Sequence, residues 1–276
     1  MSEDNPLVSV IMATFNEPPE IIESAIGSIL NQTYQNLELL IFDDSTKQDT
    51  IAAIDKMGKD SRVSIHRFTE RKGFVRSLNE GLRCAKGKYI ARMDGDDFSL
   101  PERIEKEVDY LSRNPEITVV GGQMDIMNEW GQVISHRTYP THGAKLWLFS
   151  CLRNPLAHPA IMMRREIIDK GYCYNENLKM SEDLDFWLRL LNDGYTIANM
   201  KDTVLRFRVQ DDFNAKRVSN TQRKYMADVR KANFKWSHPL HGMLSVLAGW
   251  VFTQVSPELI KRFYNKENKK MERREQ

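Results

Sequence analysis

The chain has 276 residues, 41% of them hydrophobic, which is enough to bury the core of a full α/β domain. Its three cysteines, Cys84, Cys151 and Cys173, are an odd number without CxxC spacing, which excludes a disulfide scaffold and a zinc knuckle. The first six residues are polar and acidic, unlike a secretory signal. Polar residues interrupt the apolar stretch between Pro239 and Pro257, which is too short to span a bilayer. These features predict a cytoplasmic protein.

Strands and helices are expected to alternate over the first 113 residues. Residues 7–12 are apolar and β-branched without a helical period, as in a strand buried on both faces. From Pro19 to Leu30, apolar residues recur every three or four positions, which predicts an amphipathic helix. This alternation predicts a parallel sheet with helices on both faces. The remaining expected strands are 37–42, 63–68 and 89–93, and the remaining helices are 46–57, 75–84 and 101–113.

The alternation weakens after a strand expected at 117–121. Residues 124–127 and 132–139, on either side of a turn-like segment, predict a hairpin. The second half is therefore expected to be built differently from the first. Its other predicted elements are a loop leading to a strand over 154–163, a helix over 182–192, short strands over 195–200 and 204–209, and a polar helix over 214–234.

An acidic run, Asp94–Asp97 with the sequence Asp-Gly-Asp-Asp, directly follows a predicted buried strand. Three carboxylates around one glycine repel each other unless they share a cation. Oxygen ligands suit Mn²⁺ or Mg²⁺, which also bind phosphate oxygens, and the glycine lets the backbone approach a ligand. Phe98 and Ser99 stand where an EF-hand needs an oxygen ligand and a glycine, which excludes that motif. The alternative is an acidic turn before a helix, with Ser99 as its cap.

Two other polar turns follow predicted strands, at 14–17 and 43–45. Ligands of parallel sheets bind at the carboxyl ends of the strands, so the three turns are expected to converge on one crevice. Asp and Ser are also favoured at helix N-caps, so residues 43–45 are an N-cap run for the next helix in the alternative interpretation. Both interpretations can hold, with Asp44 binding a ligand while its neighbours cap the helix.

Taken in order, these motifs resemble the family 2 glycosyltransferases, over roughly residues 7–210. The resemblance implies an α/β fold of the GT-A type, in a domain over 1–210. Its Rossmann-like half, 7–123, binds the nucleotide sugar and its other half, 124–210, binds the acceptor, with a helical, basic extension over 211–276. The motifs are Val8–Glu17, Ser28–Tyr34, Glu38–Leu39, Asp43–Ser45, Ser77–Asn79, Gly87–Ile90 and Asp94–Asp97.

Roles in donor binding are implied by the same resemblance. Asp44 reads the nucleobase, Asp94 contacts the ribose or donor sugar, and Asp96 holds the Mn²⁺ or Mg²⁺ that bridges to the diphosphate. A loop with the family pattern Asn-x-Gly approaches the nucleotide, but this chain has Arg71-Lys72-Gly73 there. The implied donor-binding residues are Thr14, Phe15, Asn16, Glu17, Asp44, Gly73, Arg76, Asp94 and Gly95.

The run Glu182–Trp187 resembles the acidic motif that supplies the family's catalytic base. The resemblance implies that Asp183 is the base, that Glu182 orients the acceptor, and that His158 belongs to the acceptor site. Trp187 is expected either in the core or in the wall of the acceptor pocket. Carboxylates in the first turn of a helix are also stabilised by the helix dipole without any further role. A lone histidine is likewise common as a structural residue.

The expected reaction is an inverting transfer of a sugar from a nucleotide diphosphate, with one general base and no covalent intermediate. The resemblance favours a UDP-sugar, with GDP- and dTDP-sugars as alternatives, and a saccharide or lipid-linked saccharide acceptor of cell-surface polysaccharide synthesis. A non-catalytic nucleotide-sugar-binding protein is the alternative from another class. Residues 14–19 lack the glycine-rich phosphate loop of dehydrogenases and nucleotidyltransferases.

The basic residues are concentrated at the C-terminal end of the chain. Residues 201–276 hold 17 Lys and Arg against 8 Asp and Glu, whereas residues 1–200 hold 23 against 30. A basic segment beside an apolar run predicts peripheral attachment to the inner face of the cell membrane, and a soluble helix packed on the domain is the alternative. No nucleic-acid partner is expected.

Overall fold

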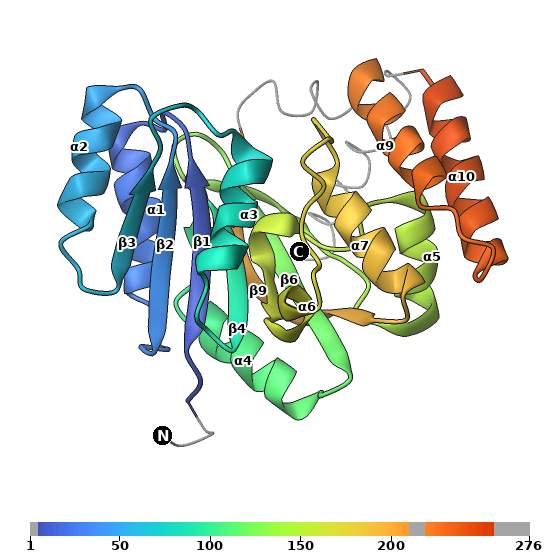
Figure 1. Cartoon of the computed structure of the whole chain (residues 1–276), viewed down its shortest axis with the longest axis horizontal. Helices are drawn as coiled ribbons and strands as arrows, with labels where there is room; N and C mark the ends of the chain where they lie inside the picture. The colour runs from blue at the N-terminus through green and yellow to red at the C-terminus, as the bar shows by residue number, and fades with distance from the viewer. Residues whose placement is uncertain (1–4, 210–218, 257–276) are drawn as a thin grey trace.

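A computed structural model describes residues 5–209 and 219–256 and contains one nine-stranded sheet. The strand order is β3-β2-β1-β4-β8-β6-β9-β5, with β7 paired to the outer part of β6. Figure 1 shows the sheet in the middle of the molecule with helices on both of its faces. The predicted α/β class is therefore confirmed.

The first four strands form the parallel part of the sheet, as expected from their alternation with helices. Three of them, β1, β2 and β4, are almost fully buried, whereas the edge strand β3 is partly exposed. Two helices start later than predicted: residues 46 and 47 donate backbone N–H groups to Asn16 Oδ1, and the Pro101 carbonyl accepts the Thr33 N–H in a turn. The elements are β1 (Val8–Thr14), α1 (Pro19–Leu30), β2 (Leu37–Asp43), α2 (Gln48–Met57), β3 (Val63–Arg67), α3 (Phe74–Cys84), β4 (Tyr89–Asp94), β5 (Phe98–Ser99) and α4 (Arg103–Arg113).

The second half continues the sheet with both antiparallel and parallel strand pairs. β8 lies between β4 and β6 and is antiparallel to both, and the predicted β6–β7 hairpin is confirmed. The elements are β6 (Ile117–Met127), β7 (Val133–Arg137), α5 (Gly143–Leu152), the 3-10 helix η1 (His158–Ala160), β8 (Ile161–Arg164), α6 (Glu166–Asp169), α7 (Glu182–Asn192), β9 (Thr196–Arg208), α9 (Asn220–Ala232) and α10 (Pro239–Gln254).

Two pairs of predicted strands are each one continuous strand. β6 runs without a break through 117–127, and β9 through 196–208. The two strands pair in parallel along their whole length, and register shifts absorb the irregularities between Gly121 and Met124. Because this pairing resumes after each shift, the chain does not leave the sheet. The predicted boundary between residues 123 and 124 falls inside β6.

Apolar side chains form one core on each face of the sheet. The first core joins the sheet to α1, α2 and α4, through residues such as Ile26, Ile54 and Ile104. The second joins it to α3 and α7, through residues such as Leu82 and Phe186. With both faces covered, the carboxyl ends of the parallel strands are left as the place where polar side chains gather.

The C-terminal part of the described chain is a pair of helices. α9 begins after Ser219, whose hydroxyl accepts the Gln222 N–H, and residues 214–218 of the predicted helix lie outside the described range. α10 follows and packs against both α9 and α5. No helix within 5–209 or 219–256 combines the length and the hydropathy that crossing a bilayer requires.

We expect replacement of Arg103 by methionine to lower the free energy of unfolding by about 3–5 kcal/mol. Arg103 and Glu107 are fully buried, and Arg103 Nε donates to Glu107 Oε1 at 3.0 Å. Arg103 Nη2 also donates to the Arg92 carbonyl of β4 at 2.8 Å. The substitution removes these hydrogen bonds and leaves the Glu107 carboxyl buried without its partner. Urea denaturation followed by circular dichroism measures the loss.

The matched control is Arg113→Met in the same helix. Arg113 pairs with Asp109 at the same i,i+4 spacing, but the two side chains are 76% and 49% exposed. Exposed pairs contribute little, so a loss below about 1 kcal/mol is expected. Similar losses in the two variants would contradict the role given to the buried pair.

Candidate active site

The carboxyl ends of β1, β2 and β4 open into a cavity of about 400 Å³. The three polar turns predicted to converge all contribute side chains to it. Residues from α3 and from the end of β9 complete the wall. The lining residues are Ala13, Thr14, Phe15, Glu17, Asp44, Arg71, Phe74, Ser77, Asp94, Gly95, Asp96, Phe207 and Arg208.

The turn after β1 is held by its own polar side chains. Asn16 has a φ of 63° and uses its side-chain oxygen to accept the Thr46 and Lys47 N–H groups at 2.8 and 2.9 Å. Glu17 accepts the Phe15 N–H at 2.9 Å, and burial raises the pKa of its carboxyl. Asn16 therefore fixes the shape of the turn, while Phe15 and Glu17 face the cavity.

Asp44 organises the loop that leads into α3. Its two carboxylate oxygens accept the N–H groups of Lys72 at 3.1 Å and of Gly73 at 2.7 Å. Gly73 has a φ of 79°, which favours glycine at this position. In the same loop, the Arg71 guanidinium lies over the Phe15 ring at 3.6 Å from its centroid. The N-cap of α2 is Lys47, so the prediction that residues 43–45 cap this helix is wrong.

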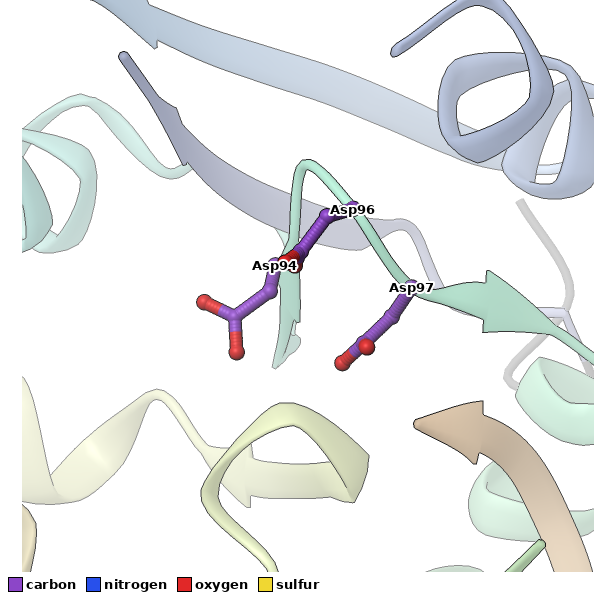
Figure 2. Close-up of side chains that lie close together, drawn as sticks. All are labelled: Asp94, Asp96 and Asp97. Carbon is purple, nitrogen blue, oxygen red and sulfur yellow. The ribbon is translucent and has the colours of Figure 1, made fainter. Parts of the chain in front are cut away.

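The acidic run forms a tight turn between β4 and β5. Carboxylate oxygens of Asp94, Asp96 and Asp97 lie within 4.8 Å of one another, and Figure 2 shows the Asp96 side chain directed back toward Asp94. A Cβ on Gly95 would lie 3.0 Å from a methyl carbon of Thr14. The glycine therefore allows the turn to approach β1. Ser99 belongs to β5 and is not the cap of α4, whose N-cap is Glu102.

The electrostatics of this turn fit a divalent cation. Burial, together with the charges of Asp94 and Glu17, raises the pKa of Asp96 to about 7. Burial and the two neighbouring aspartates raise the pKa of Asp97 well above its ordinary value. Within the described residues, the buried Oδ2 of Asp97 has no hydrogen-bond partner. A shared Mn²⁺ or Mg²⁺ would offset the repulsion among these carboxylates and would give the unpaired oxygen a partner.

Two arginines that the sequence did not single out hold the acidic turn. Arg92 is buried within β4, and its guanidinium makes a two-pronged ion pair with Asp94, one contact being 2.8 Å. Arg208, at the end of β9, donates its backbone N–H to Asp97 Oδ1 and its Nε to the Asp96 carbonyl, both at 2.9 Å. A buried arginine needs a charged or polar partner. Arg92 inside an apolar strand could therefore have indicated a nearby buried carboxylate.

The predicted catalytic carboxylates lie at the start of α7. Ser181, just before the helix, has a φ of 63°, and Asn154 donates a hydrogen bond to Asp183. Burial and then the charge of Asp183 raise the pKa of Glu182 to about 7, and the more distant charge of Asp94 contributes to the same shift. Glu182 is therefore within electrostatic range of the acidic turn, although neither Glu182 nor Asp183 lines the cavity.

His158 is buried against Phe74, which lines the cavity. Its Nε2 is 2.8 Å from the Tyr174 hydroxyl, and its ring packs edge-on against Phe74 and Trp187. Burial lowers the pKa of His158 well below its ordinary value, so the ring is neutral. Trp187 is fully buried in the core. Arg76 is 63% exposed and pairs with Glu176 at 3.4 Å.

The structure thus brings together most of the residues assigned to the donor and separates the others. Thr14, Phe15, Glu17, Asp44, Asp94, Gly95 and Asp96 line the cavity. Asn16, Gly73, Arg76, Glu182, Asp183, His158 and Trp187 lie outside its lining. Sequence reasoning missed Phe74, Arg92, Asn154, Phe207 and Arg208.

We expect Mn²⁺ to raise the melting temperature more at about pH 8 than at about pH 6. The pKa of Asp96 is raised from 3.8 to about 7, so the folded protein without metal binds the proton more tightly than the unfolded chain does. Stability from this group is therefore lost as the pH rises from 3.8 to about 7. A cation binds the deprotonated carboxylate and competes with the proton. Thermal unfolding with and without MnCl₂ tests this, and an equal shift at both pH values would contradict it.

Comparisons with known proteins agree with this arrangement. The family model "Glycosyl transferase family 2" matches residues 9–172. The O-antigen biosynthesis glycosyltransferase WbnJ of Escherichia coli is 36% identical over 211 residues, covering 74% of this chain and 80% of WbnJ. The chain belongs to glycosyl transferase family 2, and it is a glycosyltransferase.

Solved structures are similar in fold. The S. aureus protein TarS (residues 1–349), in complex with UDP-GlcNAc, has a TM-score of 0.67 at 18% identity, covering 87% of this chain and 70% of that one. The mannosyltransferase PcManGT of Pyrobaculum calidifontis, in complex with GDP-Man and Mn²⁺, has a TM-score of 0.65 at 17% identity, covering 91% and 74%. The expected GT-A fold is confirmed.

Proposed function

We propose that this chain is a metal-dependent, inverting glycosyltransferase that takes its sugar from a nucleotide diphosphate. The observation that carries the proposal is one cavity lined by both Asp44 and the acidic turn with Asp96. Asp44 offers carboxylate oxygens for a base or ribose, and the turn offers a cation site for a diphosphate. TarS is in complex with UDP-GlcNAc in its structure and PcManGT with GDP-Man and Mn²⁺, which supports a sugar nucleotide as donor.

Asp94, Asp96 and Asp97 are the residues proposed to hold Mn²⁺ or Mg²⁺, with Asp96 as the principal ligand. When bound, the cation supplies positive charge that stabilises the departing diphosphate. Arg92 keeps Asp94 in a fixed orientation, and Arg208 fixes the backbone of the turn. The protein therefore presents an ordered set of carboxylates before the donor arrives, which reduces the reorganisation needed in the transition state.

Asp183 is proposed to act as the general base. It accepts the proton of the acceptor hydroxyl while that oxygen attacks the anomeric carbon from the side opposite the diphosphate. Asn154 orients its carboxylate. Glu182 is proposed to orient the acceptor, and its pKa of about 7 suits hydrogen bonding to a hydroxyl in either protonation state. His158 and Trp187, whose rings pack edge-on against each other, are proposed to form the buried support of the acceptor site.

We propose a UDP-sugar as donor and a saccharide or lipid-linked saccharide as acceptor. The role of WbnJ in O-antigen biosynthesis supports a reaction in cell-surface polysaccharide synthesis. Within the proposed 1–210 domain, residues 7–123 are proposed to bind the donor, with Phe207 and Arg208 completing the wall of its cavity, and the rest of residues 124–210 to bind the acceptor. The protein acts on the cytoplasmic side, with its basic extension over 211–276 attached to the inner face of the membrane.

A donor screen tests the proposal. The purified full-length protein is incubated with Mn²⁺ and one sugar nucleotide at a time, drawn from UDP-, GDP- and dTDP-sugars, and release of the nucleoside diphosphate is measured. Release that depends on Mn²⁺ and on one donor is expected. Tight binding of a sugar nucleotide without release, in the presence of cell-envelope saccharides, would favour a non-catalytic binding protein instead.

A further inference from the structure

The last described helix, α10, turns its small and polar residues inward and its large apolar residues outward. His241, Gly242, Ser245, Ala248 and Gly249 face the rest of the protein and are at most 9% exposed. A helix packed on a soluble domain normally has the opposite arrangement. The outward stripe, called here the α10 apolar face, consists of Leu240, Met243, Leu247 and Trp250, which are 64%, 62%, 55% and 59% exposed.

Specific contacts fix this orientation. Arg230 of α9 is buried and donates to Ser245 Oγ at 2.8 Å, and His241 Nε2 is 2.9 Å from the Ser150 hydroxyl of α5. A Cβ on Gly242 would lie 2.6 Å from the Phe234 ring, so only glycine allows this close approach. Rotating α10 to bury its large side chains would break these hydrogen bonds and remove that fit. The exposed apolar stripe is therefore a built feature of the fold.

The α10 apolar face lies beside a positively charged helix. Together, α9 and α10 form a groove of about 1300 Å³ that includes the four residues of the face and the exposed side chains of Lys224 and Lys231. Residues 219–256 contain five Lys and Arg and a single acidic residue, Asp228. α10 itself contains no Asp, Glu, Lys or Arg. An apolar stripe next to lysines matches an anionic lipid surface in both hydrophobicity and charge.

We propose that the α10 apolar face docks on the surface of an anionic lipid bilayer. With 16 residues, α10 is shorter than the roughly 20 needed to span the membrane, so it lies in the plane of the interface. Trp250 enters the boundary between headgroups and acyl chains, where tryptophan is favoured, and Lys224 and Lys231 reach the lipid phosphates. Figure 1 shows α9 and α10 side by side at the end of the molecule opposite α2, clear of the sheet.

The docked helices are joined to the helix that carries the proposed base. Asn233, at the end of α9, donates to Asp185 Oδ1 of α7 at 2.8 Å and accepts from Asn192 at 2.7 Å. Gln222 donates to Ser181, the residue before Glu182, at 3.3 Å. Docking therefore fixes the position and orientation of α7 relative to the membrane surface. This step rests on the proposed function, since it brings a lipid-linked acceptor to Asp183.

Vesicle co-sedimentation of the full-length protein tests the docking. The vesicles contain either phosphatidylcholine alone or phosphatidylcholine mixed with phosphatidylglycerol. The test variant carries Met243→Gln, Leu247→Gln and Trp250→Gln. The matched control carries Trp130→Gln, Val133→Gln and Ile134→Gln, which replace apolar side chains that are 74%, 41% and 51% exposed on the β6–β7 hairpin. Circular dichroism and melting temperature establish that both variants are folded.

The wild-type protein and the control are expected to sediment with the anionic vesicles, and the test variant to partition at least about ten-fold more weakly. Equal binding of the test variant and the wild type would overturn the proposal. The proposal would also be overturned if neither the wild type nor the test variant sedimented with vesicles and the wild type formed a dimer that dissociated in the test variant. The α10 apolar face would then join two copies of the chain. Release of nucleoside diphosphate in solution is measured in parallel. If the wild-type protein releases none from any donor, the proposed function is refuted, but the result on docking still stands.

Discussion

Replacement of Asp96 by asparagine is expected to reduce sugar transfer by at least about 10³-fold. Asp96 lies in the acidic turn that lines the cavity, and burial together with repulsion from Asp94 and Glu17 raises its pKa. A bound cation would offset both effects. An amide of the same size keeps the shape of the turn but removes one negative charge from the cation site. Transfer is measured as Mn²⁺-dependent release of nucleoside diphosphate from the donor found in the screen.

Asp202→Asn is the matched control for this variant. Asp202 is exposed on β9 and pairs with Lys106 at 3.2 Å, away from the cavity. It should transfer sugar at the wild-type rate and keep the Mn²⁺-dependent rise in melting temperature, which the Asp96 variant should lose. Full activity of Asp96→Asn, or an undiminished response to Mn²⁺, would refute the assigned role.

Replacement of Asp183 by asparagine is expected to lower kcat by about 10²–10⁴-fold. The amide cannot accept the proton of the acceptor hydroxyl, although it can still form a hydrogen bond with Asn154. The donor contacts on β1, β2 and β4 are unchanged, so the KM for the sugar nucleotide should stay within about three-fold of the wild type. Steady-state kinetics with a saturating acceptor measures both quantities.

The control for the base is Asp169→Asn. Asp169 is 61% exposed in α6 and pairs with Arg165 at 3.5 Å. Its loss should leave kcat unchanged. A large rise in donor KM in Asp183→Asn, with kcat preserved, would show that Asp183 binds the donor and is not the base. Because Asp96 is proposed to hold the cation and Asp183 is not, Asp183→Asn should leave Mn²⁺ binding unchanged, whereas Asp96→Asn should weaken it.

Most of the first half of the fold could be predicted because three of its parallel strands, β1, β2 and β4, are buried on both faces and its helices carry a clear apolar stripe. The second half was harder for physical reasons. α5 has apolar residues on all sides, with Trp147 and Leu148 partly exposed, so it shows no amphipathic period. The strands β6 and β9 are interrupted by glycine or charged residues and are held together by pairing between distant segments. Local sequence does not contain that information.

Only some residues of the proposed donor site could likewise be predicted from the local sequence. Asp44 and Asp94–Asp97 could be found because each follows a strand of the parallel sheet, where ligands bind. Arg208 and Phe207 reach the same cavity from a strand more than 100 residues away, and nothing in their local sequence marks them. Asn154 likewise depends on the packing of its loop beside α7.

The hydrogen bonds between Arg208 and the acidic turn have a consequence for protein synthesis. Arg208 and Asp97 are 111 positions apart, so a growing chain displays the Asp-Gly-Asp-Asp motif long before the residue that braces it has been translated. Contacts of such long range form late in folding. An unfinished polypeptide therefore carries the acidic motif without the arginine that braces it, and the turn can take its final shape only after residue 208 has been synthesised.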